Sequence, residues 1–389
     1  MACLVQVDGV PVDHFHLHQG VDMHSASATP LCLGRLAGRC RVLGHDEDHL
    51  VVLAHAATGQ FSPEKCREEV HEVSVASTKG NMRNEELRGS TIVITGVTGQ
   101  VAKPLALALA RENEVYGAAR FTDEAARLAL ESAGVHCVPV DLLAGDVGGL
   151  PTDADYVLHF AVSKTNNWET DLAANSGGLA TLMEHHREAR AFLHCSTTGV
   201  YKPDGHRLFA EDGPLGDNHG VWPFLRTYSI CKIAAEATAR WAATRFDLPT
   251  TIARLSVPYG DGGGWPAIHL HMMLSGHAVP VHIDAPSVYH PLHADDILTM
   301  VPRLLDVATV PATTVNWGGS EGVSIEEWCT YLAELTGIEA RFEPTAQTID
   351  SVQIDTTRMH ELVGHTTVAW RDGMRRMVEA LHPDKVRPQ

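Results

Sequence analysis

The sequence predicts an α/β protein in which helices cover both faces of a doubly wound parallel sheet, with a smaller lobe towards the C-terminus. From residue 90 onward, short apolar runs rich in β-branched residues alternate with segments of helical character. The first of these runs ends in a glycine turn that leads directly into a helix. The 389 residues are 44% hydrophobic and 20% charged, which is typical of a globular protein with a substantial core.

The strands and helices follow from the periodicity of apolar residues. A fully buried strand has a short, continuous apolar run, and residues 91–95 (Thr-Ile-Val-Ile-Thr) form such a run. Each strand is followed by a helix long enough to cross back over the sheet, so the strands should be parallel. We expect strands at residues 91–95, 114–118, 135–140, 156–161, 191–195 and 250–255, and helices at residues 101–111, 123–132, 171–187 and 228–245.

The composition divides the chain into three parts. Residues 1–88 hold many histidines and no clear alternation of strand and helix, so we expect an N-terminal extension that is poorly ordered or outside the fold. Residues 89–260 carry the alternating pattern and should form the main domain. Residues 261–389 are less regular and should form mainly a smaller substrate-binding lobe, with segments that return to the main domain.

Charge and cysteine content exclude several classes of protein. The formal net charge of -18 disfavours binding to nucleic acid or to an anionic membrane surface. No apolar run reaches the roughly 20 residues that a membrane-spanning helix needs. The 8 cysteines are scattered and include no C-x-x-C pair, which favours a reduced, cytoplasmic protein.

The glycine turn predicts a dinucleotide site on a Rossmann-type sheet. Gly96, Gly99 and Ala102 have the spacing G-x-x-G-x-x-A between a strand and a helix. Glycines let the backbone approach a pyrophosphate, which then lies at the positive end of the helix dipole. We therefore expect Gly96, Gly99, Gln100 and Val101 to bind the cofactor.

Cofactor choice depends on the residues after the second and third strands. An acidic residue at the end of the second strand would bind the ribose hydroxyls of NAD, but Arg120 stands there. Arg120 could pair with a 2′-phosphate, so the sequence favours NADP(H) over NAD(H), although Asp123 could still serve NAD. Asp141 and Leu142 follow the third strand and are expected beside the adenine.

A catalytic set is predicted at the carboxyl edge of the same sheet. Tyr228 and Lys232 are four residues apart, which places them on one face of a helix. A nearby ammonium favours the phenolate, so the Tyr228 side chain could exchange a proton with an alcohol or ketone. Thr197 ends the fifth strand and could hydrogen-bond the substrate oxygen, while Ser196 and Thr198 would be packing hydroxyls.

These motifs resemble the extended short-chain dehydrogenase/reductase superfamily, also called the NAD-dependent epimerase/dehydratase family. The resemblance runs from about residue 90 to the end of the chain. It implies that Phe160 and Ala161 line the cofactor, that Asn175 is structural, and that Lys232 also binds the cofactor ribose. The matching segments are Gly96–Ala102, Asp141–Leu142, His159–Ala161, Asn175–Gly178, Ser196–Tyr201, Tyr228–Lys232, Arg254–Gly260 and Leu292–Ile297.

The sequence also departs from some members of that family. Sugar dehydratases place Asp-Glu after the catalytic threonine, whereas this chain has Thr198 and Gly199. Nucleotide-sugar enzymes commonly carry an arginine, which holds the diphosphate, where this chain has Tyr289. The first departure disfavours sugar 4,6-dehydration, and the second disfavours a nucleotide-sugar substrate.

The predicted function is therefore an NAD(P)-dependent oxidoreductase, transferring hydride at a secondary alcohol or ketone of a small or medium-sized molecule. The first alternative is an NAD-dependent sugar epimerase, and the second is a non-catalytic regulator that senses dinucleotides. A homodimer is expected by resemblance only. We expect no metal site, although His14, His16 and His18 would lie on one side of a strand.

Overall fold

The computed structural model describes residues 87–387 and, nearer the N-terminus, the backbone of four short strands. The chain divides into two compact units, Met1–Arg83 and Asn84–Gln389. In the first unit, β1 (Ala2–Cys3) pairs with β2 (Phe15–His16), and β3 (Cys40–His45) pairs with β4 (Leu50–Ala54), both antiparallel.

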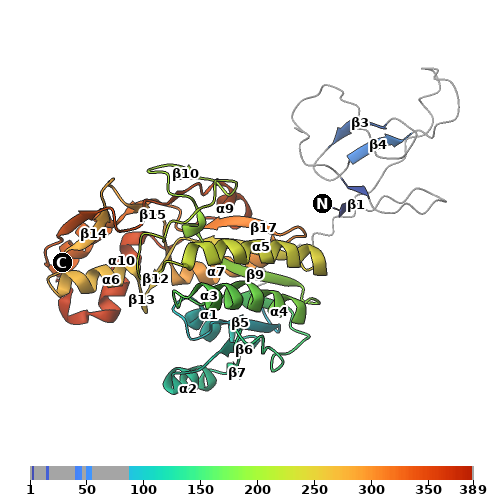
Figure 1. Cartoon of the computed structure of the whole chain (residues 1–389), viewed down its shortest axis with the longest axis horizontal. Coiled ribbons are helices and arrows are strands. Elements are labelled where there is room, and N and C mark those ends of the chain that lie inside the picture. The colour runs from blue at the N-terminus through green and yellow to red at the C-terminus, as the bar shows by residue number, and fades with distance from the viewer. Residues whose placement is uncertain (1, 4–14, 17–39, 46–49, 55–86, 388–389) are drawn as a thin grey trace. The chain divides into compact units, whose positions relative to one another are not determined.

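The second unit is built on a parallel sheet, as predicted, and the sheet has seven strands, the six expected ones and β17 (Thr313–Trp317) (Figure 1). The chain starts in the middle of the sheet, winds outward to one edge, then crosses back and winds to the other. In spatial order the strands are β17, β11 (Thr250–Leu255), β9 (Ala191–Thr197), β8 (Tyr156–His159), β5 (Thr91–Thr95), β6 (Glu114–Ala119) and β7 (His136–Pro139). The order reverses between β5 and β8, which is the switch point where ligands bind in sheets of this kind.

Helices cover both faces of this sheet. The longest is α5, whose left-handed C-terminal residue, Asp247, ends it at the point where the chain turns into β11. The helices are α1 (Ala102–Leu109), α2 (Glu124–Ser132), α3 (Trp168–Leu172), α4 (Gly178–His185), α5 (Tyr228–Phe246) and α7 (Ala294–Asp306).

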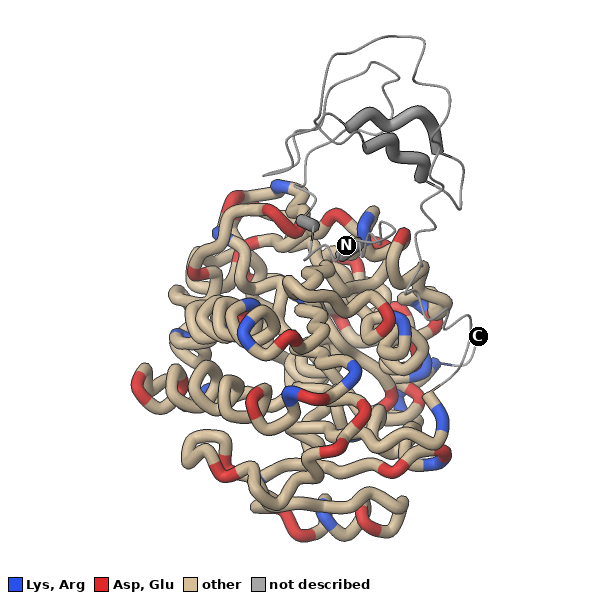
Figure 2. The backbone as a smooth tube through the Cα atoms, turned by 90° about the vertical axis from the view of Figure 1, so that its right-hand side faces the viewer, with Lys and Arg blue, Asp and Glu red and all other residues tan. Residues whose placement is uncertain are grey.

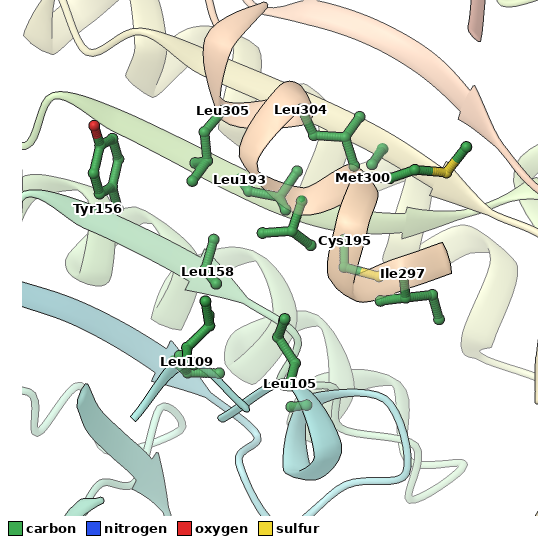
Figure 3. Packing of buried hydrophobic residues seen from close by; sticks show 14 of the residues in the cluster. Leu105, Leu109, Tyr156, Leu158, Leu193, Cys195, Ile297, Met300, Leu304 and Leu305 are labelled. Atoms are coloured by element: carbon green, nitrogen blue, oxygen red, sulfur yellow. The ribbon is translucent and has the colours of Figure 1, made fainter. Parts of the chain in front are cut away.

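Each face of the sheet has its own apolar core. On one face, leucines of α1 pack with α7 against β8 and β9 (Figure 3). Leu158 and Leu193 from the strands meet Leu105, Met300 and the neighbouring side chains of α7 there. On the other face, α4 and the alanine-rich side of α5 pack against the sheet. Apolar burial on both faces explains why the strands have continuous apolar runs.

One predicted helix differs from the structure. Residues 171–187 were expected to form one helix, but the segment consists of α3, a π-helical turn (Ala173–Gly177) and α4. Close packing accounts for the glycine that begins α4, because a β-carbon at Gly178 would lie 2.5 Å from the Leu142 carbonyl oxygen. The wider turn also places Asn175 so that its side chain bonds the loop after β8.

A smaller lobe is formed mostly by residues beyond Gly260 and has a separate core. Three of the later segments, α7, β17 and α9 (Thr357–Leu362), return to the large sheet, and Met359 of α9 belongs to its core. The lobe contains α6 (Trp265–Leu274), α8 (Ile325–Thr336), α10 (Trp370–Leu381) and the short strands β10 (Leu208–Phe209), β12 (Val257–Gly260), β13 (Gly263–Gly264), β14 (Val279–His282), β15 (Val288–Tyr289), β16 (Pro291–His293), β18 (Val323–Ser324), β19 (Phe342–Thr345) and β20 (Gln353–Ile354).

Charged residues of both signs are interspersed over the described part of the chain (Figure 2). None of the helices within residues 87–387 combines the length and apolar character needed to cross a bilayer.

Candidate active site

The glycine turn after β5 is shaped by close backbone contacts. Gly96 has φ +69°, and a β-carbon there would lie 2.8 Å from the Cα atom of Ala161. The Gly99 amide donates to the Gly96 carbonyl oxygen at 2.8 Å, which closes the turn. The amides of Gln100 and Val101 have no backbone partner within residues 87–387 and lie at the start of α1. Unpaired amides at the start of a helix are the groups that bind a pyrophosphate.

The predicted cofactor-selecting residues lie at the carboxyl ends of the next two strands. Arg120 follows β6 and is exposed. Asp141 follows β7 and is also exposed, with one carboxylate oxygen accepting the Leu143 amide at 3.0 Å. Asp123 instead caps α2, accepting the amides of Ala125 and Ala126. Asp123 therefore has a structural role in this fold, and Arg120 and Asp141 keep polar atoms open to a ligand.

Phe160 and Ala161 lie directly beside the glycine turn, at the end of β8. The Ala161 amide donates to the Thr95 hydroxyl at 3.2 Å, and the Phe160 amide donates to the Thr95 carbonyl oxygen. Thr95 also bonds His159 Nδ1 at 2.8 Å. These bonds join the ends of β5 and β8, where the sheet order reverses.

The three predicted catalytic residues meet at the same edge. Thr197 is the last residue of β9, Tyr228 begins α5, and Lys232 lies one turn further along α5. The Thr197 hydroxyl accepts the Gly199 amide at 3.1 Å and lies near enough to the Tyr228 phenol to favour a lower pKa of that phenol. Lys232 is buried, and its Nζ atom donates to the Cys195 carbonyl oxygen at 2.8 Å.

The electrostatics of this set differ from the prediction in one respect. The sequence predicts that Lys232 lowers the pKa of Tyr228, but burial raises the pKa of Tyr228 to about 12 and outweighs the lowering effect of the nearby Thr197. Burial also lowers the pKa of Lys232. The physical reason is that the ammonium bonds a carbonyl on β9 while the phenol lies in a poorly solvated place. The Tyr228 phenol is consequently protonated at neutral pH.

A buried carboxylate, Asp171, joins the loop after β8 to the residue before Tyr228. It accepts hydrogen bonds from the hydroxyls of Ser163 at 2.7 Å, Thr165 at 2.9 Å and Thr227 at 2.7 Å. It also accepts the amides of Thr165 and Asn166. Burial raises the pKa of Asp171, but these donors prevail and the net pKa is lowered.

A second bridge connects the same two loops. Asn166, in the left-handed region with φ 64°, accepts the Arg226 amide at 3.0 Å and donates to the Pro223 carbonyl oxygen. Asn175 bonds both backbone groups of Ser163 at 2.8 Å. The loop after β8 and the loop that precedes Tyr228 are therefore fixed to one another before any ligand binds.

A buried ion pair between Glu236 and Arg254 joins the elements that carry the site. Glu236, one turn beyond Lys232, accepts the Ser196 hydroxyl at 2.6 Å and two hydrogen bonds from Arg254. Arg254 also contacts the ring of Tyr201. Arg254 begins one of the segments that resemble the family, and the structure places it in this internal pair. The network holds β9, β11 and α5 together around Thr197.

Three residues of the site were not predicted from sequence, namely Asp171, Thr227 and His219. The position of Thr227 directly before Tyr228 was the only local signal. Asp171 is far from Thr227 in the sequence, and the loop with His219 carries no motif. Within residues 87–387 no group of three or more histidine, cysteine or acidic side chains is arranged to hold a metal ion, and His14 and His18 lie outside the described residues.

The residues present fit a nicotinamide dinucleotide. The glycine turn leaves no room for a β-carbon, free amides begin α1, and polar side chains follow β6 and β7. The catalytic set lies past the switch point, across β8 from the turn.

Comparisons with known proteins agree with this architecture. The model of the NAD dependent epimerase/dehydratase family matches residues 92–318. No curated protein sequence gives a significant match.

Several solved structures share the fold. UDP-glucuronic acid 4-epimerase from Bacillus cereus, in complex with UDP-glucuronic acid and NAD, is 20% identical with a TM-score of 0.64, over 75% of this chain and 98% of that one. dTDP-glucose 4,6-dehydratase from Bacillus anthracis, in complex with NAD, is 18% identical with a TM-score of 0.64, over 76% and 98%. UDP-glucose 4-epimerase from Thermotoga maritima, with UDP-glucose, is 19% identical with a TM-score of 0.63, over 76% and 99%.

The likeness in fold and the family match lead to the same assignment, which confirms the resemblance seen in the sequence. The family model spans the glycine turn, the catalytic set and β17. The chain belongs to the NAD dependent epimerase/dehydratase family.

Proposed function

We propose that the protein is an NAD(P)-dependent oxidoreductase that acts on a secondary alcohol or ketone of a small or medium-sized molecule. The observation that carries this proposal is the meeting of Thr197, Tyr228 and Lys232 at the carboxyl edge of the sheet. When bound, a nicotinamide dinucleotide supplies or accepts the hydride. Thr197 orients the carbonyl oxygen, Tyr228 transfers the proton, and Lys232 anchors the ribose.

The protonation state of Tyr228 favours reduction of a ketone. Burial raises the pKa of Tyr228 to about 12, so the phenol carries its proton at neutral pH. A protonated phenol can donate to the oxygen of a carbonyl group as that carbon takes the hydride. Oxidation of an alcohol needs the phenolate and therefore benefits from alkaline pH.

Cofactor binding is assigned to Gly96, Gly99, Gln100, Val101, Arg120, Asp141, Leu142, Phe160, Ala161 and Lys232. Arg120 supports NADP(H) somewhat over NAD(H), because an exposed guanidinium stands where an acid would select NAD. The solved Bacillus cereus and Bacillus anthracis enzymes of similar fold are complexes with NAD, so both dinucleotides are tested.

The alternative is an NAD-dependent sugar epimerase, which would use the same residues and keep its dinucleotide tightly bound. Against a nucleotide-sugar substrate, Tyr289 occupies the position where such enzymes commonly carry arginine. It is buried, its hydroxyl donates to the Asp350 carbonyl oxygen at 2.7 Å, and it packs on Trp265 and Trp328. A purely regulatory dinucleotide sensor has no need of the catalytic set.

A small-molecule substrate, a cytoplasmic location and a homodimer are part of the same proposal. The described cysteines, Cys137, Cys195, Cys231 and Cys329, are free thiols, which is compatible with a reducing compartment. Exposed Trp241 on α5 and Leu172 on α3 give these helices apolar surface for a second copy.

The experiment has two stages. Calorimetry with NAD, NADH, NADP and NADPH identifies the cofactor, and a ketone and alcohol screen with the preferred one identifies turnover. Tyr228→Phe should then abolish turnover and leave dinucleotide affinity largely unchanged. Turnover that survives this substitution contradicts the mechanism, and nicotinamide dinucleotide released from freshly denatured protein would favour the epimerase.

A further inference from the structure

His219 lies beside the catalytic tyrosine and has no role in the mechanism described above. The ring centroids of His219 and Tyr228 are 5.0 Å apart, with planes at 68°. The opposite edge of the histidine packs on the turn after β9, where a β-carbon at Gly199 would lie 2.5 Å from Cε1. His219 is therefore held between the turn that follows Thr197 and the phenol of Tyr228.

The hydrogen bonds of Ser229 fix the tautomer of His219. The Ser229 hydroxyl donates its only proton to the Gly199 carbonyl oxygen at 2.6 Å. Its oxygen can then only accept from His219 Nδ1, which lies 2.9 Å away, and it also accepts the His219 amide. Nδ1 consequently carries the proton, and Nε2 of the neutral ring presents a lone pair.

Nε2 of His219 has no hydrogen-bond partner within residues 87–387 and is not completely buried. Several other histidine nitrogens that lack a partner in this part of the chain are fully buried, whereas part of the surface of this one reaches solvent. Burial lowers the pKa of His219 to about 4, so the ring is neutral at pH 7 and Nε2 remains an acceptor.

The segment after His219 adds apolar surface to the same place. Trp222 lies 6.2 Å from the His219 ring and 6.5 Å from Phe224, measured between centroids. Phe224 is 72% exposed and Val221 is 55% exposed, although large apolar side chains are usually covered. An acceptor nitrogen beside the partly buried Trp222 and the exposed Phe224 suits a ligand with both a hydroxyl and an apolar group.

We propose that His219 is a specificity-determining residue whose Nε2 accepts a hydrogen bond from a hydroxyl on the carbon adjacent to the reacting carbonyl, with an apolar substituent against Trp222 and Phe224. This inference rests on the proposed function and names its substrate class, the apolar α-hydroxy ketones. In the reduction, the carbonyl carbon takes a hydride from the reduced dinucleotide and its oxygen takes the Tyr228 proton. The products are a vicinal diol and the oxidised dinucleotide.

The test compares two ketones that differ in one hydroxyl, α-hydroxyacetophenone and acetophenone. The full-length protein is assayed with each ketone and the reduced dinucleotide that it binds, by loss of nicotinamide absorbance. The quantity compared is kcat/KM for α-hydroxyacetophenone divided by kcat/KM for acetophenone. Because this ratio in each variant is compared with the ratio in the wild type, the difference in intrinsic reactivity between the two ketones cancels.

Two substitutions of His219 distinguish the role of Nδ1 from that of Nε2. His219→Asn keeps a donor for Ser229 but removes the acceptor at the Nε2 position, whereas His219→Gln can place an amide oxygen there. We expect His219→Asn to lower the ratio by about 10- to 100-fold through the hydroxy ketone alone, as for loss of one buried hydrogen bond. His219→Gln should retain a larger part of the ratio, with dinucleotide affinity unchanged in both variants.

Other outcomes overturn the proposal. An equal loss with both ketones means that His219 is only structural, and an unchanged ratio means that Nε2 does not contact the hydroxyl. Failure to reduce either ketone while the dinucleotide binds excludes this substrate class, whereas failure to bind any dinucleotide refutes the proposed function itself. Should His219→Asn not fold, a wild-type crystal with 1-phenyl-1,2-ethanediol decides, since the terminal hydroxyl must lie about 2.7–3.2 Å from Nε2.

Discussion

The Thr227 hydroxyl donates a 2.7 Å hydrogen bond to the carboxylate of Asp171, 56 residues earlier in the chain. Both side chains are fully buried. Because Thr227 immediately precedes Tyr228, this bond fixes the start of α5 relative to the loop that follows β8. The position of the catalytic phenol thus depends on a carboxylate that does not touch the reacting atoms.

Thr227→Val should reduce catalysis without weakening cofactor binding. The substitution keeps the shape and removes the donor, so the start of α5 is freed. We expect kcat for α-hydroxyacetophenone to fall by about 10- to 100-fold, the scale of a small misplacement in an active site. The control is Ser163→Ala, which removes a donor from the same carboxylate on the loop side and should cost less. Equal losses would show that the charge of Asp171 matters, and not the placement of Tyr228.

Gly96→Ala should weaken dinucleotide binding. The new β-carbon would meet the Ala161 backbone at 2.8 Å, and the residue has φ +69°. We expect the Kd measured by calorimetry to rise by about tenfold or more, as the turn can no longer approach a pyrophosphate closely. Gly134→Ala is the matched control, because Gly134 has φ +88° and open space around it. Gly134→Ala should lose some stability and keep the wild-type Kd. A wild-type Kd for Gly96→Ala would contradict the assignment of the turn.

His194→Leu should make the protein less sensitive to acid. Burial, with a smaller contribution from Lys232, lowers the pKa of His194 well below its ordinary value, and neither ring nitrogen has a partner within residues 87–387. The folded state thus binds fewer protons than the unfolded state below about pH 6.5, and stability present above that pH is lost as the pH falls. Each such histidine contributes a slope of up to about 1.4 kcal/mol per pH unit to the free energy of unfolding.

Denaturant unfolding between pH 7.5 and 5 measures this slope. We expect a smaller slope for His194→Leu than for the wild type. The control is His277→Leu, which removes an exposed imidazole in the same way. The account of His194 fails if both variants titrate like the wild type.

Arg120→Ser should change the choice of cofactor. A guanidinium that binds a 2′-phosphate contributes a charge-assisted hydrogen bond, so its loss should raise the Kd for NADPH by about tenfold and leave that for NADH unchanged. Arg111, an exposed arginine after α1, is the control position, and Arg111→Ser should alter neither Kd. Equal affinities of Arg120→Ser and wild type for NADPH would remove the basis for preferring NADP.

Much of the fold could be predicted because its signals are local. The strands at 91–95 and 250–255 agree with the structure, since buried β-branched runs between helices have few other solutions. The helix at 171–187 was predicted less well, because the interruption by a π-helical turn depends on packing against Leu142. Asp171 and His219 act through partners distant in the chain, so no local pattern could reveal them.

The most direct measurement is a crystal structure of the protein with its preferred dinucleotide bound. The account predicts a pyrophosphate against the amides of Gln100 and Val101, and a nicotinamide ring that faces the Tyr228 hydroxyl. Between C4 of that ring and the hydroxyl there must be space for one substrate carbon, about 3–3.5 Å from C4. A nicotinamide ring directed away from Tyr228, or a dinucleotide bound elsewhere, would contradict it.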